Sequence, residues 1–183
     1  VNDDMKQQKA VNQLKHYKEL ENFLLDTIDG DGVVNIKELN EVAENAELKK
    51  VSTDKIITIL NYWDIKKYVK RETRKRSKNH VKITFLENHE ELRERFTKRM
   101  MISDFVIDYL YEKSQDDEDV VEFSELELIE AFAFENRLLQ LEASQKEMED
   151  ALFYLSKIGA LKIEGGFLVL YNALTIERLE LNN

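Results

Sequence analysis

The amino-acid sequence predicts a mainly helical protein of the α+β class, with small β-hairpins attached to its helices. Three observations predict this class. Apolar residues recur at helical spacing over long segments, short alternating segments typical of strands follow them, and the whole pattern occurs twice. The 183 residues, 43% of them apolar, are enough for one large domain or two small ones with cores of their own.

Each copy of the pattern begins with a helix and continues with a short strand. Val11, Leu14, Tyr17, Leu24 and Ile28 keep helical spacing in the first copy, and Leu92, Phe96, Met100, Val106 and Leu110 keep it in the second. The strands "VVNI" and "VVEF" follow. The segment from about His89 to Lys113 has no Gly or Pro, so we expect one long helix that couples the copies stiffly.

Polar residues mark the starts of the next two helices. Asn35 with Glu38, and Ser124 with Glu127, predict the second helix of each copy. The third helix begins at Ser52-Thr53 or at Ser144, where Glu147 completes a capping box, and it ends near Ile65 or Gly159. Two strands then follow, turning at Gly165-Gly166 in the second copy.

The order helix, strand, helix, helix, strand, strand is that of a winged helix, a helix-turn-helix pair with a hairpin wing. The sequence therefore predicts tandem winged-helix domains, 1–88 and 89–183, joined by a long helix. In the alignment of the copies, "VVNIKELNEVAE" (33–44) matches "VVEFSELELIEA" (120–131). Further on, Leu60 is aligned with Phe153, Ile65 with Ile158 and Tyr68 with Leu161.

Composition restricts the possible functions. The chain has no Cys, so disulfides, zinc fingers and thiol catalysis are excluded within these residues. Without a signal segment or a long apolar run, we expect a cytoplasmic chain that contacts no membrane. Because it starts with Val1, we expect it to be cut from a longer protein.

Charge is unevenly distributed along the chain. The formal charge of −10, taken alone, argues against nucleic-acid binding. From Lys66 to Arg99, however, the chain has thirteen Lys and Arg residues and five Asp and Glu residues. From Ser103 to Glu164 it has five basic and seventeen acidic residues. Blocks of opposite charge indicate two modules with different partners.

The stretch "DTIDGDGVVNIKEL" (26–39) resembles the calcium loop of an EF-hand. Asp29, Asp31, Gly32, Asn35 and Glu38 fill loop positions 3, 5, 6, 9 and 12. Position 1 is Thr27, which supplies no carboxylate, and the second copy has Asp119 where the loop Gly belongs. A turn with a solvated acidic tip is the favoured interpretation.

Catalytic constellations are missing from the sequence. His16, His80 and His89 have no metal-binding spacing, and no phosphate-binding GxxxxGK[ST] loop occurs. The many paired carboxylates are interpreted as solvated helix faces. We therefore expect no enzyme site, no metal and no cofactor in these residues.

The basic hairpin, Lys66 to His80, is the main candidate site. Such a hairpin can pair its cations with successive phosphates of a duplex, and the alternative is a loop that only solubilises the chain. Its basic residues, which are the predicted DNA contacts, are Lys66, Lys67, Lys70, Arg71, Arg74, Lys75, Arg76 and Lys78.

In a DNA-bound winged helix the third helix usually enters the major groove. In the first copy its predicted outward residues are Lys55, Thr58, Asn61 and Tyr62, with Ile56, Leu60 and Trp63 in the core. Lys55 and Tyr62 complete the predicted DNA contacts, and the weak basicity favours recognition of shape over sequence. The equivalent second-copy helix offers Lys146, Glu149, Asp150 and Lys157, which predicts protein contact.

Residues Ala151–Glu180, with Asn35–Glu41 and Lys78–His80 upstream, resemble the region beyond the motor in bacterial RecQ-like superfamily-two DNA helicases. The resemblance implies a parent enzyme of DNA repair that unwinds DNA 3′-to-5′ with ATP and Mg²⁺. It implies that these residues are a non-catalytic accessory region, which grips duplex or forked DNA weakly and without sequence preference beside the helicase motor. The Walker motifs, the DExH box and the four-cysteine zinc site are absent here.

Two other function classes remain open. An acidic tandem winged-helix scaffold that binds proteins and not DNA would suit the net charge of −10. A calcium-binding module is the third class.

The hairpin tip "TRKRSKN" has no aromatic residue, so strand separation is not expected of it.

Calcium should neither bind tightly nor order the fold, because Thr27 removes one of the carboxylates that set affinity. Isothermal titration calorimetry should give a dissociation constant weaker than about 10⁻⁵ M, the limit of the sensor range. A tighter constant would contradict this prediction.

Overall fold

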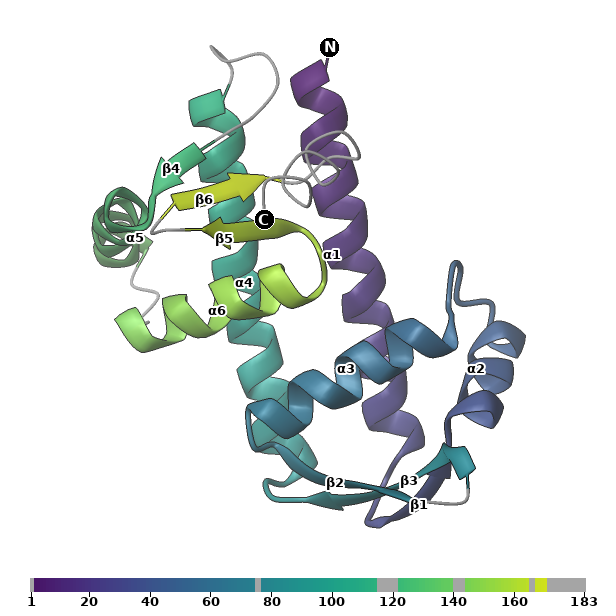
Figure 1. Cartoon of the computed structure of the whole chain (residues 1–183). Coiled ribbons are helices and arrows are strands. Elements are labelled where there is room, and N and C mark those ends of the chain that lie inside the picture. Colours follow the sequence, from purple (N-terminus) through teal and green to yellow (C-terminus); the bar gives the residue numbers. More distant parts are fainter. Residues whose placement is uncertain (1, 75–76, 115–121, 140–143, 165–166, 171–183) are drawn as a thin grey trace. The chain divides into compact units, whose positions relative to one another are not determined.

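The computed structural model describes residues 2–74, 77–114, 122–139, 144–164 and 167–170 (Figure 1). The order helix, strand, helix, helix, strand, strand occurs twice and the chain is mainly helical, as predicted. The strands form two small antiparallel sheets. The elements are α1 (Asn2–Thr27), β1 (Gly32–Asn35), α2 (Ile36–Asn45), α3 (Thr53–Ile65), β2 (Val69–Arg74), β3 (Ser77–Phe85), α4 (His89–Ser114), β4 (Glu122–Ser124), α5 (Glu125–Leu139), α6 (Gln145–Lys157), β5 (Leu161–Glu164) and β6 (Phe167–Leu170). Across these ranges, no helix is long and apolar enough to span a membrane.

The chain divides into two compact units. The first unit holds residues 15–96, and the second holds residues 1–14 together with 97–183. In the predicted domains, 1–88 and 89–183, α1 lies entirely in the first domain and α4 entirely in the second. In the structure each of these helices contributes residues to both units. The physical reason lies in packing: the Phe96 ring stacks on Trp63 of the first unit, and Gln13 donates a hydrogen bond to the Ile158 carbonyl of the second.

Trp63 lies at the centre of the first unit. Its side chain is fully buried, and its Nε1–H donates to Glu21 Oε2 of α1 at 2.9 Å. Its indole lies against the rings of Phe96 and Phe85, with centroids 5.9 Å and 6.3 Å away. These contacts join α1, α3, β3 and the start of α4. The remaining core includes Leu20, Leu24, Leu25, Ile56, Ile59, Leu60 and Ile83.

The sheet of the first unit has the order β1-β3-β2, with β3 antiparallel to both neighbours. Val81 at its centre pairs with Val34 of β1 and with Thr73 of β2. The second unit repeats this order as β4-β6-β5. The turn predicted at Gly165-Gly166 lies outside the described residues, between two strands that pair antiparallel.

The predicted caps form at the helix starts. The Asn35 side chain accepts from the Lys37 and Glu38 amides, and Ser52 Oγ accepts from the Lys55 amide. Ser144 and Glu147 make the full capping box at α6. Each bond satisfies an amide that has no acceptor within its own helix, so these residues fix where the helices begin.

In the second unit α6 packs its apolar face inward, with Met148, Leu152 and Leu155 buried. The Arg99 guanidinium lies 3.7 Å from the centroid of the Tyr154 ring, and Lys98 pairs with Glu147 at 2.9 Å. Burial alone would raise the pKa of the Glu147 carboxyl, but hydrogen bonds from Lys98 and Ser144 and the charge of Lys98 hold that pKa below its usual value.

The helix ends correct the predicted alignment of the two copies. Both third helices close with the same bonds: Tyr68 N–H to Trp63 O and Ala160 N–H to Leu155 O, each at 2.9 Å. Lys67 and Gly159 take equivalent left-handed positions, with φ of 61° and 77°. The pairs Leu60–Phe153, Ile65–Ile158 and Tyr68–Leu161 are therefore wrong by one residue. In the structural alignment Tyr62 corresponds to Tyr154, and Leu60 corresponds to Leu152.

Replacing Lys67 by Gly should stabilise the fold. Relief of about 1–2 kcal/mol of left-handed strain exceeds the roughly 0.4–1 kcal/mol of added unfolded-chain entropy, so we expect a net gain of about 0.5–1 kcal/mol. Differential scanning calorimetry should record a rise of about 1–4 °C in Tm.

Gly159→Ala is the matched control for Lys67→Gly. A Cβ at Gly159 would meet nothing within 4 Å, so its effect reports the positive φ and not a steric clash. We expect this variant to lower Tm. A Lys67→Gly protein that melts below wild type contradicts the assignment.

Candidate nucleic-acid interface

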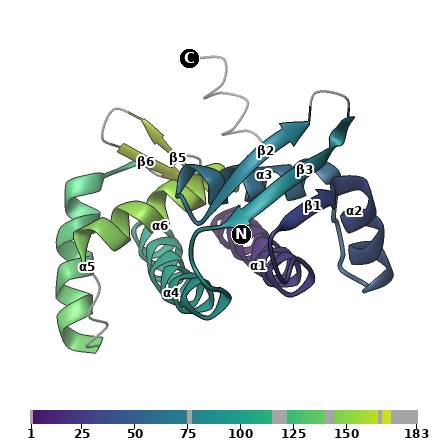
Figure 2. The same ribbon diagram turned by 90° about the horizontal axis from the view of Figure 1, so that it is seen from below.

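The outer face of the first unit's sheet is the candidate interface. Successive strand residues point to opposite faces, and Val81 and Ile83 of β3 are buried, so Lys82 between them points outward and is exposed. On β2, Lys70 and Glu72 share this face and are both exposed. Figure 2 shows the three strands side by side in the order β1, β3, β2.

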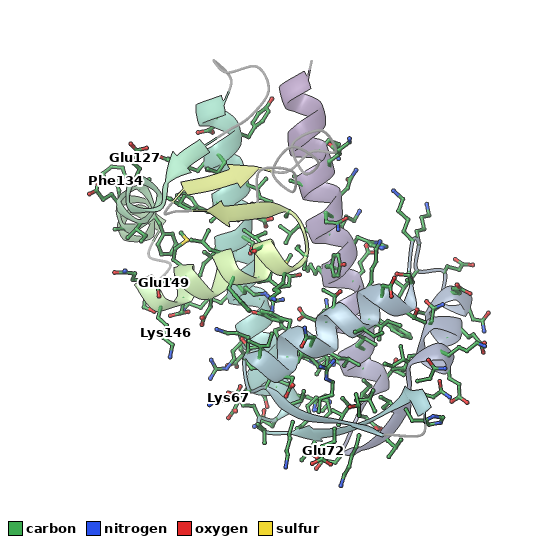
Figure 3. The ribbon with its side chains drawn as sticks, viewed as in Figure 1. Lys67, Glu72, Glu127, Phe134, Lys146 and Glu149 are labelled. Carbon is green, nitrogen blue, oxygen red and sulfur yellow. The ribbon has the colours of Figure 1, made fainter. Side chains whose placement is uncertain are left out.

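The charges on this outer face are arranged around Glu72. Lys70 Nζ lies 3.2 Å from Glu72 Oε1, and both side chains are more than half exposed. Lys82 stands directly across from Glu72 in the strand register. Figure 3 shows Glu72 directed away from α3. One carboxylate thus faces two ammonium groups, and the outer face keeps a net positive charge.

Arg71, a predicted DNA contact, is turned inward. It is partly buried, and its Nη2–H donates to Asn61 Oδ1 of α3 at 3.3 Å. Its guanidinium therefore ties β2 to α3. Lys66, the C-cap of α3, is also partly buried, whereas Lys67 is exposed where α3 meets β2 (Figure 3).

The hairpin tip carries the other four predicted contacts. The backbone pairing of β2 with β3 extends to Arg74 and Ser77, with a shift of register between Thr73 and Arg74. The side chains of Arg74, Lys75, Arg76 and Lys78 lie outside the part that the structure describes, so their role as contacts stays a prediction.

Tyr62 is not an outward residue of α3, and that prediction is wrong. Its side chain is 2% exposed and packs edge-on against the Tyr68 ring, with centroids 6.1 Å apart. Tyrosine is amphipathic, and its ring here adds to the core beside Trp63. The predicted burial of Ile56, Leu60 and Trp63 is confirmed.

Lys55 lies at the start of α3 and is partly buried. Its Nζ donates to the Lys50 carbonyl at 2.8 Å and sits 5.9 Å from the centroid of the Tyr17 ring. Burial, together with the Lys50 charge, lowers the pKa of the Lys55 ammonium. Lys55 therefore closes the turn before α3 instead of projecting from its outer face.

The exposed face of α3 is apolar and acidic. Ile57 and Ile65 are 40% and 47% exposed, Asp54 is exposed, and Asn61 between them is held by Arg71. Lys55 is the only basic residue of this helix. Such a face offers no cation to phosphate and little to read base edges, so α3 does not extend the positive outer face.

The acidic turn before β1 has structural partners. Asp31 Oδ1 accepts from the Phe85 amide at 2.8 Å, which joins the turn to the end of β3. Within the described ranges, no group of three or more His, Cys, Asp or Glu is placed to hold a metal ion. The absence of tight calcium binding stays a prediction.

The histidines also make structural contacts. His16 Nε2 lies 3.0 Å from the Lys50 carbonyl oxygen, and His89 Nε2 lies 2.8 Å from the Ile28 carbonyl oxygen. His80 Nε2 lies 3.4 Å from Asn35 Nδ2, across β1 and β3. Each ring thus joins segments distant in sequence.

Lys82 was missed by the sequence reasoning. The sequence does contain the signal. Polar and apolar residues alternate in "HVKITF", which predicts that Lys82 points to the other face of the strand from Val81 and Ile83. Lys82 lies on the strand after the turn, outside the dense cluster of basic residues that marks the hairpin.

Comparison with known proteins identifies no relative: no protein-family model, no curated protein and no solved structure matches the chain. The function must therefore be inferred from the geometry and charge of the chain itself.

Glu72→Gln should make the outer face more positive, since it removes the partner of Lys70 and the charge opposite Lys82. On a heparin column the variant should elute at higher salt than wild type. Because an exposed ion pair contributes about 0–1 kcal/mol, the Tm should change little. Glu41→Gln on the exposed part of α2 removes the same charge elsewhere in the unit. Equal retention of the two variants would show that only net charge matters.

Proposed function

We propose that the chain is a non-catalytic DNA-binding accessory region that holds duplex or forked DNA by its phosphates. The contact surface is the outer face of the β1-β3-β2 sheet together with the basic hairpin tip. The observation that carries the proposal is the outward placement of Lys70 and Lys82 on neighbouring strands, together with the exposed Lys67 in the turn before β2. From Lys66 to Lys82 the chain has nine basic residues and one acidic residue.

Binding through this surface is independent of base sequence. Lys and Arg on a sheet face contact phosphates, and phosphate contacts set register and affinity but carry no sequence information. The α3 face, with Asp54, Ile57 and Ile65 outward, supplies no donors suited to base edges. We expect dissociation constants in the non-specific range, about 10⁻⁴ to 10⁻⁶ M at physiological salt.

The finer assignment, tandem winged helices of a RecQ-like DNA helicase, belongs to the same proposal. Its support is the repeated element order, the matching strand orders β1-β3-β2 and β4-β6-β5, and the resemblance in sequence. In this proposal the ATP- and Mg²⁺-dependent unwinding belongs to a motor elsewhere in the parent chain. The residues described here supply the grip on duplex DNA.

An acidic protein-interaction scaffold is the second candidate function. The observation that favours it is charge: the second unit has 21 acidic and 10 basic residues, whereas the first has 16 and 17. Phosphates are repelled by such a surface. The two functions are compatible if the first unit binds DNA and the second binds protein.

The salt dependence of DNA binding tests the proposal. For wild type, the logarithm of the affinity for a forked duplex should fall linearly with the logarithm of salt, with a slope of roughly −4 for four or five phosphate contacts. Lys70→Ala with Lys82→Ala should flatten the slope by about 2, and Arg74→Glu with Lys75→Glu and Arg76→Glu by about 3. Fluorescence anisotropy across a salt series measures each slope.

The matched control lies on α6 of the second unit. Lys146→Glu with Lys157→Glu makes the chain more acidic without touching the outer face, so the slope should change little. If neither the sheet variant nor the tip variant alters the slope, the DNA surface is misplaced. If wild type fails to bind at low salt, the scaffold becomes the better function.

A further inference from the structure

Phe134 on α5 is the most exposed large apolar side chain of the described residues, at 64%. The opposite side of α5 packs into the core, where Leu128 and Phe132 are buried. The Phe132 ring packs against Phe105 of α4, with centroids 5.6 Å apart. The core contacts of α5 are thus made without Phe134, and its ring stays on the surface.

Two carboxylates share the surface of α5 with this ring. Glu130 precedes Phe134 by four residues and Glu127 precedes it by seven, so the three side chains follow one stripe of the helix. Both glutamates are exposed. Figure 3 shows Phe134 on the side of α5 that is turned away from α4. We name Glu127, Glu130 and Phe134 the acidic-aromatic face.

The charge around the acidic-aromatic face indicates which kind of partner segment it can bind. The helix α5 contains four Glu residues and one basic residue, Arg137, and the unit as a whole has 21 acidic and 10 basic residues. Phosphate groups are repelled by such a surface, whereas a basic segment is attracted to it. The occupant must also cover an aromatic ring that lies one helical turn from a carboxylate.

We propose that the acidic-aromatic face docks an arginine-containing basic segment of a partner protein. A guanidinium is planar and weakly hydrated, so it can stack on the Phe134 ring while its N–H groups pair with the Glu130 carboxylate. Glu127 extends the negative stripe to a second cation. A lysine ammonium is compact and strongly hydrated, so it gains less from the ring and pairs at a single point.

The test uses the full chain and two short fluorescein-labelled peptides, one of alternating Arg and Ala and one with Lys in place of each Arg. Fluorescence anisotropy at low salt should give tighter binding of the Arg peptide, by roughly 5- to 10-fold, as stacking and bidentate pairing add to charge. Phe134→Leu keeps an apolar side chain of good helix propensity but removes the ring, and it should abolish the preference for Arg. Glu127→Gln with Glu130→Gln should weaken both peptides.

Glu149→Gln is the matched control, since it removes an exposed carboxylate from α6 (Figure 3) and should change either affinity less than about 2-fold. Equal affinities for the two peptides, no binding of either, or an unaltered preference in Phe134→Leu would each overturn the proposal. It would also be overturned by sedimentation showing that wild type self-associates and Phe134→Leu does not, because the occupant would then be a second copy. None of these measurements contains DNA, so their failure leaves the proposed DNA binding intact.

Discussion

The buried hydrogen bond from the Trp63 indole to the Glu21 carboxylate is the contact on which the first unit depends. A buried carboxylate is costly without a donor, and a buried indole N–H is costly without an acceptor, so each group requires the other. The pair fixes α3 against α1, and the rings of Phe85 and Phe96 pack against the same indole. Because β2 starts directly after the turn that ends α3, this placement also decides which residues of the sheet face outward.

Much of the fold could be predicted because its determinants are local. Caps such as Asn35, Ser52 and the Ser144–Glu147 box act within a single turn, so their positions in the chain are sufficient to place the helix starts. Apolar spacing in α1 and α4 is likewise readable without knowing the partner. The order of elements follows from these signals.

The orientation of single side chains depended on contacts distant in sequence. Helical spacing predicted that Tyr62 points outward, whereas its side chain is buried and packs against the Tyr68 ring across the following turn. The sequence predicts Arg71 as one more exposed cation of the hairpin, whereas in the structure its guanidinium donates to Asn61 of α3. Lys55 donates to the Lys50 carbonyl, and counting charges along the sequence cannot predict this hydrogen bond. The predicted interface is therefore smaller on α3 and larger on β3 than the sequence indicated.

The sharing of α1 and α4 between the two units has a consequence for dissecting the molecule. A fragment ending at residue 88 would lose the Phe96 ring from Trp63 and the His89 contact with the Ile28 carbonyl, leaving core surface open to water. A fragment beginning at Lys15 would start in the middle of a helix, where the first amides lose their acceptors. Proteolysis or gene truncation at the apparent boundary would therefore yield aggregation-prone pieces, and residues 15–96 with a new N-cap at their start are the better minimal fragment.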